Sequence, residues 1–150
     1  METINFAKKM HYQKIGFAFC AGLSKEARIV SGLFEQHGFN VSSVCCKNAA
    51  IPKEELGLTE EQKLRPGEWE TMCNPIGQAM LLNHDETEFN VMMGLCVGHD
   101  SVFLHYAEAM TTVLAAKDRA LAHNPIGAIY CDHYFSSKLA PNPENPPIDD

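Results

Sequence analysis

Short runs of hydrophobic residues alternate along the chain with longer amphipathic stretches. Runs of this kind cover residues 14–20, 39–46, 88–96 and 111–116. Nearly continuous hydrophobic runs of this length are typical of strands that are buried on both faces, as in a parallel sheet. We therefore predict four strands at these positions.

The stretches around these strands carry signals for helices. Ser24 is a candidate N-cap and Gly38 a candidate stop for a helix between them. The tetrapeptide NPIG occurs twice and is expected to open a helix each time, with asparagine as the cap and proline at the first helical position. The predicted helices cover residues 1–12, 24–38, 73–83, 99–109 and 123–139.

Alternation of strands and helices indicates an α/β fold. We predict a Rossmann-like three-layer sandwich with a mainly parallel sheet of about four strands in the order 2-1-3-4 and right-handed crossovers. Such sheets bind ligands at the carboxyl ends of the strands, beside the point where the strand order reverses. Residues 1–140 are predicted to form a single domain, and the acidic, Pro-rich tail at 141–150 is predicted to be disordered.

The composition narrows the classes of partner. The chain of 150 residues has a formal net charge of −7, whereas nucleic acids and anionic membranes require clustered Lys and Arg. We expect neither as a partner. A cytoplasmic location is expected because the first residues lack the apolar core of a secretory signal. A sheet of four strands is small for this architecture, so we also expect a homodimer that completes one edge or face.

Six cysteines are present, and none belongs to a CxxC pair. In a cytoplasmic protein they are expected to be reduced. The predicted topology brings four of them to one sheet edge, at the ends of the first three strands and at the start of the helix before the third: Cys20, Cys46, Cys96 and Cys73. Thiolates are soft ligands, so this set predicts a zinc ion or an iron–sulfur cluster that supports redox or sulfur chemistry on a small molecule. Scattered structural thiols are the alternative, because cysteine is often buried in cores.

Two further expectations concern individual cysteines. Cys20 and Cys96 end neighbouring strands, so they are the pair expected to form a disulfide when a metal is lost in air. Cys131 lies inside the last predicted helix and is assigned a packing role.

Gly94 and Gly98 flank Cys96 in the sequence GLCVG, between a predicted strand and a predicted helix. This spacing matches a nucleophile elbow, in which glycines permit a tight turn that exposes the side chain. The candidate catalytic residues are then Cys96, His99 and Asp100. A metal-free cysteine enzyme for acyl or thiol transfer is therefore the first alternative function. The same glycines would also let the backbone bend closely around a bound ligand.

Charged residues follow the fourth strand, again at the edge where a ligand is expected: Lys117, Asp118, Arg119 and His123. They could hold an anionic substrate or balance thiolate charge. His123 is a second candidate base for Cys96, and a solvated loop is the alternative for the whole segment. A non-catalytic module that binds a small molecule in the same crevice is the second alternative function.

Residues 47–72 interrupt the alternation of strands and helices. They are rich in glutamate and contain Trp69. We predict a long loop with one or two short helical turns. Loops of this length often serve as lids, binding loops or interfaces, and a solvated excursion is the alternative.

Six segments resemble a family of uncharacterised prokaryotic proteins known as domain of unknown function 1847: KIGFAFCAGL, VCCK, MCNPIGQAMLLN, GLCVGHDS, KDRALAHNP and YCDHY. The resemblance runs from about residue 2 to about residue 139. Members are often labelled metal-binding, which implies a metal site but no reaction. Many members begin with an additional cysteine-rich segment that this chain lacks, whereas the four cysteines of the predicted site lie in the matching part.

Overall fold

A computed structural model describes residues 1–140 of the chain, except for the side chains at 137–139. Four parallel strands form one sheet in the order β2-β1-β3-β4. Their bounds are β1 (Lys14–Phe19), β2 (Asn40–Cys45), β3 (Phe89–Met93) and β4 (Thr111–Ala115). The predicted fold class, the parallel sheet and the strand order are confirmed. The tail predicted to be disordered, 141–150, lies outside the described residues.

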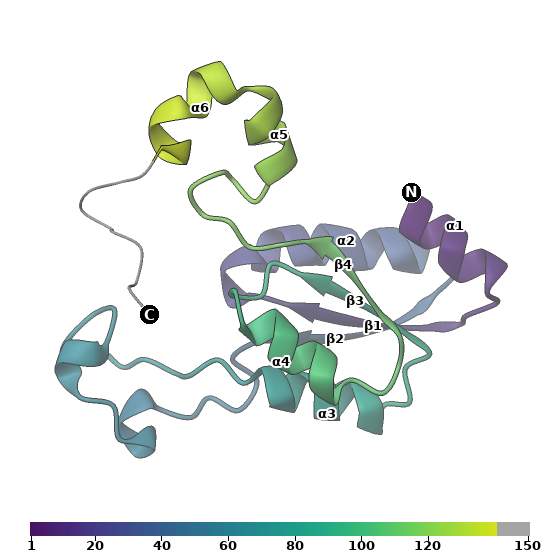
Figure 1. The fold of residues 1–150 in the computed structure, drawn as a ribbon. Helices are drawn as coiled ribbons and strands as arrows, with labels where there is room; N and C mark the ends of the chain where they lie inside the picture. The colour runs from purple at the N-terminus through teal and green to yellow at the C-terminus, as the bar shows by residue number, and fades with distance from the viewer. Residues whose placement is uncertain (141–150) are drawn as a thin grey trace.

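Helices cover both faces of the sheet (Figure 1). One face carries α1 (Glu2–Lys9) and α2 (Ser24–Gln36), and the other carries α3 (Pro75–His84) and α4 (His99–Tyr106). A short 3₁₀ helix, η1 (Ala21–Leu23), joins β1 to α2. This arrangement gives the three layers predicted. No helix in the described part of the chain is long and apolar enough to cross a membrane.

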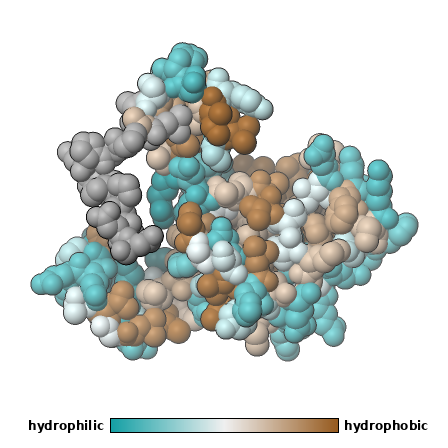
Figure 2. All heavy atoms as spheres, in the orientation of Figure 1, coloured by the Kyte–Doolittle hydropathy of each residue, from teal (hydrophilic) through white to brown (hydrophobic). Residues whose placement is uncertain are grey.

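Residues 47–72 form an excursion that leaves the carboxyl end of β2 and returns to the start of α3. It contains two 3₁₀ helices, η2 (Lys53–Leu56) and η3 (Glu60–Gln62), as predicted for this loop. Inside it, the buried Lys63 ammonium donates to a Glu60 carboxylate oxygen and to the Glu68 carbonyl oxygen, each at 2.8 Å. The excursion also presents large side chains to solvent, including Leu56, Leu64 and Trp69. Hydrophobic surface is visible in this region of Figure 2.

The helix predicted over 123–139 is divided into α5 (Pro125–Tyr130) and α6 (Asp132–Leu139). Cys131 leaves helical geometry, with φ −112° and ψ 37°. Its carbonyl oxygen then accepts hydrogen bonds from the next turn and starts α6. The prediction of a single helix was therefore wrong. Cys131 is also exposed, so its predicted packing role was wrong as well.

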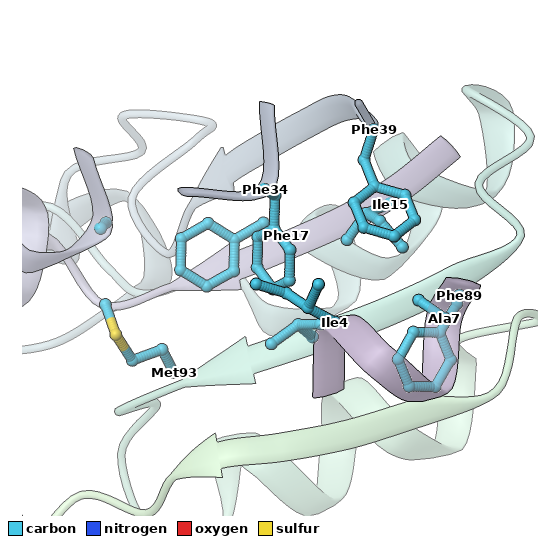
Figure 3. Packing of buried hydrophobic residues seen from close by; sticks show 10 residues of the cluster. Ile4, Ala7, Ile15, Phe17, Phe34, Phe39, Phe89 and Met93 are labelled. Atoms are coloured by element: carbon cyan, nitrogen blue, oxygen red, sulfur yellow. The ribbon is translucent and has the colours of Figure 1, made fainter. Parts of the chain in front are cut away.

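The hydrophobic core has two parts, one on each face of the sheet, because side chains alternate along a strand. Ile15 and Phe17 of β1 enter the part under α1 and α2 (Figure 3). Ala18 enters the part under α3 and α4, where it packs with Phe103 and other buried residues. Cys20 and Cys46 belong to this second part. They therefore lie where the α3–α4 layer meets the carboxyl edge of the sheet.

Candidate metal centre

A cavity of about 940 Å³ opens at the carboxyl edge of the sheet, between the strand ends and the excursion. Cys20 and Cys46 directly follow β1 and β2, and Cys96 lies in the turn between β3 and α4. Cys73 directly precedes Asn74, the N-cap of α3. All four cysteines line the cavity. The structure thus brings together residues that no local motif connects.

Main-chain hydrogen bonds position three of these thiols. The Cys20 amide donates to the Met93 carbonyl oxygen at 3.2 Å, and the Cys46 amide donates to the Phe19 carbonyl oxygen at 2.9 Å. Each cysteine thereby extends the ladder of the sheet by one residue. The Asn74 amide donates to the Cys46 carbonyl oxygen at 2.7 Å. This last bond holds the start of α3 against the end of β2.

The cluster with the geometry of a metal site consists of Cys73, Cys96 and His99. Their sulfur and imidazole ligand atoms all lie within 4.8 Å of one another, and all three residues are half-buried. His99 is the first residue of α4, and its amide donates to the Cys96 carbonyl oxygen at 2.9 Å. The turn therefore carries both side chains to the same side. Two thiolates and one imidazole form a donor set that zinc commonly takes in catalytic sites.

Cys46 lies beside this cluster. Its sulfur atom is 3.8 Å from that of Cys73 and accepts a hydrogen bond from the Ala21 amide at 3.3 Å. The hydrogen bond between the two thiols lowers the pKa of Cys73 to about 7. The same hydrogen bond, together with burial, raises the pKa of Cys46 well above its ordinary value. Burial raises the pKa of the neighbouring Cys45 as well, and this residue does not line the cavity.

Cys20 faces a cation instead of the cluster. The Lys117 ammonium lies 2.6 Å from the Cys20 sulfur and 3.8 Å from the Cys96 sulfur. The Gly22 amide donates to the Cys20 sulfur at 3.4 Å, and the Arg119 guanidinium lies 3.9 Å from the Cys96 sulfur. Of the four predicted metal ligands, two belong to the cluster, one adjoins it and one is held by Lys117.

The two glycines and Asp100 form the turn around Cys96. Gly94 has a φ of +62°, and a Cβ atom there would lie 2.2 Å from the Leu23 side chain. Gly98 has a φ of +86° and is the N-cap of α4. A carboxylate oxygen of Asp100 accepts from the amides of Gly98 and Ser101 at 2.9 and 2.8 Å. These residues shape the turn that presents Cys96 and His99.

Asp118 and His123 organise the loop after β4. A carboxylate oxygen of Asp118 accepts from the Leu121 amide at 3.0 Å, and the Asp118 amide donates to Nδ1 of His123 at 3.0 Å. His123 lines the cavity, whereas Asp118 does not. The loop therefore holds the segment that carries Lys117 and Arg119 against the cavity.

The Cys20–Cys96 disulfide, predicted for protein that has lost a metal in air, stays a prediction. The β1–β3 ladder ends at Phe19 and Met93, and the turn at Gly94 carries Cys96 beyond it. All six cysteines are free, and the Lys117 ammonium contacts the sulfur atoms of both Cys20 and Cys96. The sulfur atoms of Cys46 and Cys73 lie 3.8 Å apart, and the Cys46 thiol also interacts with those of Cys20 and Cys45.

Sequence reasoning assigned His99 to base catalysis and overlooked it as a ligand. The signal was present as Cys96-Val97-Gly98-His99, a spacing of two residues between a thiol and an imidazole. Spacings of this kind are common in zinc sites. The contribution of the excursion to the cavity, through residues such as Trp69, had no comparable local signal.

Comparison with known proteins shows the family. The model described as "Protein of unknown function (DUF1847)" matches residues 1–114, so the chain belongs to this family and the resemblance is confirmed. The uncharacterized protein MJ0455 of Methanocaldococcus jannaschii is 48% identical over 138 residues, which cover 92% of this chain and 69% of the relative. No solved structure matches the chain. The part matched by the family model contains Cys73, Cys96 and His99.

Proposed function

We propose that this member of the DUF1847 family binds one zinc ion through Cys73, Cys96 and His99, with a fourth coordination position open to the cavity. The observation that carries the proposal is the separation of the three ligand atoms, none more than 4.8 Å from another. Tetrahedral zinc would hold pairs of these atoms about 3.6 to 3.8 Å apart. Side-chain rotations suffice to close the remaining gap.

The short distances favour a single ion over a four-iron cluster. In a four-iron cluster each cysteine binds a different iron atom, so the sulfur atoms stand further apart than they do around one ion. The 3.8 Å contact between Cys46 and Cys73 matches the edge of a tetrahedron around one metal ion. Cys46 either hydrogen-bonds to the bound Cys73 or closes the site as a fourth ligand, and we favour the first arrangement. An open position is what a zinc site needs to act on a small molecule.

Metal analysis tests this proposal directly. Protein purified anaerobically without chelators is expected to contain about one zinc per chain and no acid-labile sulfide. Cys96→Ser and His99→Asn should each lose most of the zinc, whereas Cys46→Ser should retain it. Cys131→Ser is the matched control because Cys131 is exposed and far along the chain from the cluster.

Three results would count against the proposal. Absence of stoichiometric metal would refute the site. Finding iron together with sulfide would show that the site holds an iron–sulfur cluster and not zinc. Loss of zinc from Cys46→Ser would convert the open site into a closed one with four ligands. The Co²⁺-substituted protein gives a second measurement, since thiolate-to-cobalt absorption bands scale with the number of sulfur ligands.

A metal-free cysteine enzyme is the second candidate function. The observation that favours it is the position of Cys96 on a turn facing the cavity, with Lys117 and Arg119 within 4 Å of its sulfur atom. Cations beside a thiol are typical of reactive cysteines. In chelator-treated protein, iodoacetamide should then label Cys96 before Cys45 and Cys131. Equal rates for these three thiols would exclude this role.

A further inference from the structure

The cavity has two chemically different walls. The wall formed by the strand ends carries cationic groups beside the thiols, including Lys117 and Arg119. The opposite wall is formed by the excursion and carries hydrophobic side chains, including Leu58, Leu64 and Trp69. A volume of about 940 Å³ is at the upper end of the range found for small-molecule sites.

The cationic wall keeps uncompensated positive charge. Two ion pairs lie in the excursion's wall of the cavity: the Lys53 ammonium is 2.6 Å from a Glu70 carboxylate oxygen, and the Arg65 guanidinium is 3.3 Å from one of Glu68. Among the described residues, Lys117 and Arg119 have no carboxylate within ion-pair distance.

Burial makes the charge of Lys117 costly. Lys117 is only 9% exposed, and a buried ammonium group needs an anionic partner. The Cys20 sulfur contacts the buried Lys117 ammonium, whereas the exposed Arg119 guanidinium lies beside the Cys96 sulfur and is accessible to a ligand. A zinc ion with two thiolates and a neutral imidazole has no net charge, so the proposed metal site would not supply the missing negative charge.

The hydrophobic wall is open to solvent. Trp69 is 68% exposed and Leu64 is 88% exposed, although both line the cavity. The hydrophobic surface of the excursion is visible at the lower left of Figure 2. A ligand with a flat apolar body would remove part of this surface from water.

We propose that the cavity binds a small organic anion, with its carboxylate or phosphate group between Lys117 and Arg119 and its apolar body against Trp69. Both cations contact the Cys96 sulfur, so the charged end of the ligand would lie beside a proposed zinc ligand. The inference rests on the proposed function for the chemistry that follows binding. Binding itself requires only the two walls.

Trp69 is the only tryptophan in the chain, so its fluorescence reports on the cavity. Titrations at constant ionic strength should use benzoate and phenyl phosphate as probes and benzyl alcohol as their neutral counterpart. Both anions are expected to change the emission saturably, and the alcohol should bind at least about tenfold more weakly because it makes no charge-assisted hydrogen bond. The tighter of the two anions identifies the preferred charged group. Equal binding of the alcohol, or no saturable change with either anion, would overturn the inference.

Variants assign the binding to the two cations. Arg119→Gln should weaken benzoate or phenyl phosphate binding by about tenfold, and it is expected to fold because Arg119 is exposed. Lys9→Gln makes the same change of charge on an exposed position of α1 and should leave the affinity unchanged. Lys117→Met, with its fold checked by circular dichroism, provides a second test on the buried cation. Unchanged affinity in both cavity variants would refute the assignment.

The zinc proposal and this inference can fail separately. The titrations are therefore made on zinc-loaded protein and on chelator-treated protein. Stoichiometric zinc without saturable anion binding refutes the anion site alone. Anion binding in protein that never retains zinc refutes the metal site alone.

Discussion

Gln78 is expected to couple the stability of the fold to the geometry of the metal site. It lies on α3, is fully buried, and its side-chain amide donates to the carbonyl oxygens of Phe19 and Val44 at 3.2 and 2.7 Å. These two carbonyls are near the ends of β1 and β2, one residue before Cys20 and two residues before Cys46. Gln78 thus fastens the helix that follows Cys73 to the strands that carry the other two thiols.

The substitution Gln78→Leu keeps the volume of the side chain and removes both hydrogen bonds. Each bond contributes about 1 kcal/mol net, and both acceptor carbonyls keep a main-chain donor because they lie in the β1–β2 ladder. The Phe19 carbonyl keeps the Cys46 amide as a donor. The side-chain oxygen Oε1 of Gln78 has no hydrogen-bond partner in the described structure. Removing this buried polar atom therefore offsets part of the lost stability. We expect a net destabilisation of about 1–2 kcal/mol.

Two measurements are needed to separate stability from positioning. Urea unfolding of the metal-free protein gives the free energy of unfolding, and competition with a chromophoric chelator gives the zinc affinity. Leu82→Ala is the matched control, because Leu82 is a fully buried residue of the same helix and its truncation costs a similar or larger free energy, about 2–5 kcal/mol.

The zinc affinity should distinguish the two variants. It should fall in Gln78→Leu, where Cys73 loses its register with the strand ends, and change less in Leu82→Ala. The coupling would be refuted if Gln78→Leu bound zinc like the wild type. Equal losses of affinity in both variants would reduce the effect to general destabilisation.

Three further predictions concern the thiols and the turn. Metal-free protein treated with oxidised glutathione should form a Cys46–Cys73 disulfide, which peptide mapping detects. Bound zinc should prevent this disulfide from forming. A different pairing would contradict the 3.8 Å contact. At pH 7 iodoacetamide should label Cys73 faster than Cys46, since their hydrogen bond lowers the pKa of Cys73 to about 7 and raises that of Cys46. Because protonation removes the reactive thiolate, the labelling rate of Cys73 should fall as the pH drops below 7. A labelling rate independent of pH would refute this prediction. Gly94→Ala should lower the free energy of unfolding in urea by at least about 2 kcal/mol, because the position has a positive φ and an added Cβ would clash with Leu23. Gly98→Ala should lower it by about 1 kcal/mol, because that position has a positive φ but open space. Equal losses would show that the Leu23 side chain moves aside without cost.

The sequence by itself determined the four strands, their order in the sheet and the helices up to α4. Hydrophobic runs specify buried parallel strands because both faces of such strands are covered. Asn74 and Asn124 specify two helix starts because an asparagine side chain accepts the amide of the residue three positions on, here at 2.8 and 2.9 Å. These signals are local, so they can be read without knowing which residues pack against each element. They also place Cys20 and Cys46 at one edge of the sheet, once the strands are known to be parallel.

The tertiary structure decided which groups meet at that edge. Strand ends predict a neighbourhood of several ångströms, whereas a contact between two sulfur atoms depends on how each loop turns after its strand. The turn at Gly94 lies against Leu23, a residue far away in the sequence, and beyond it Cys96 meets Cys73 and His99 in one cluster. The position of Lys117 against Cys20 joins residues 97 positions apart. Such contacts result from packing among several elements, and no periodicity or local spacing in the chain encodes them.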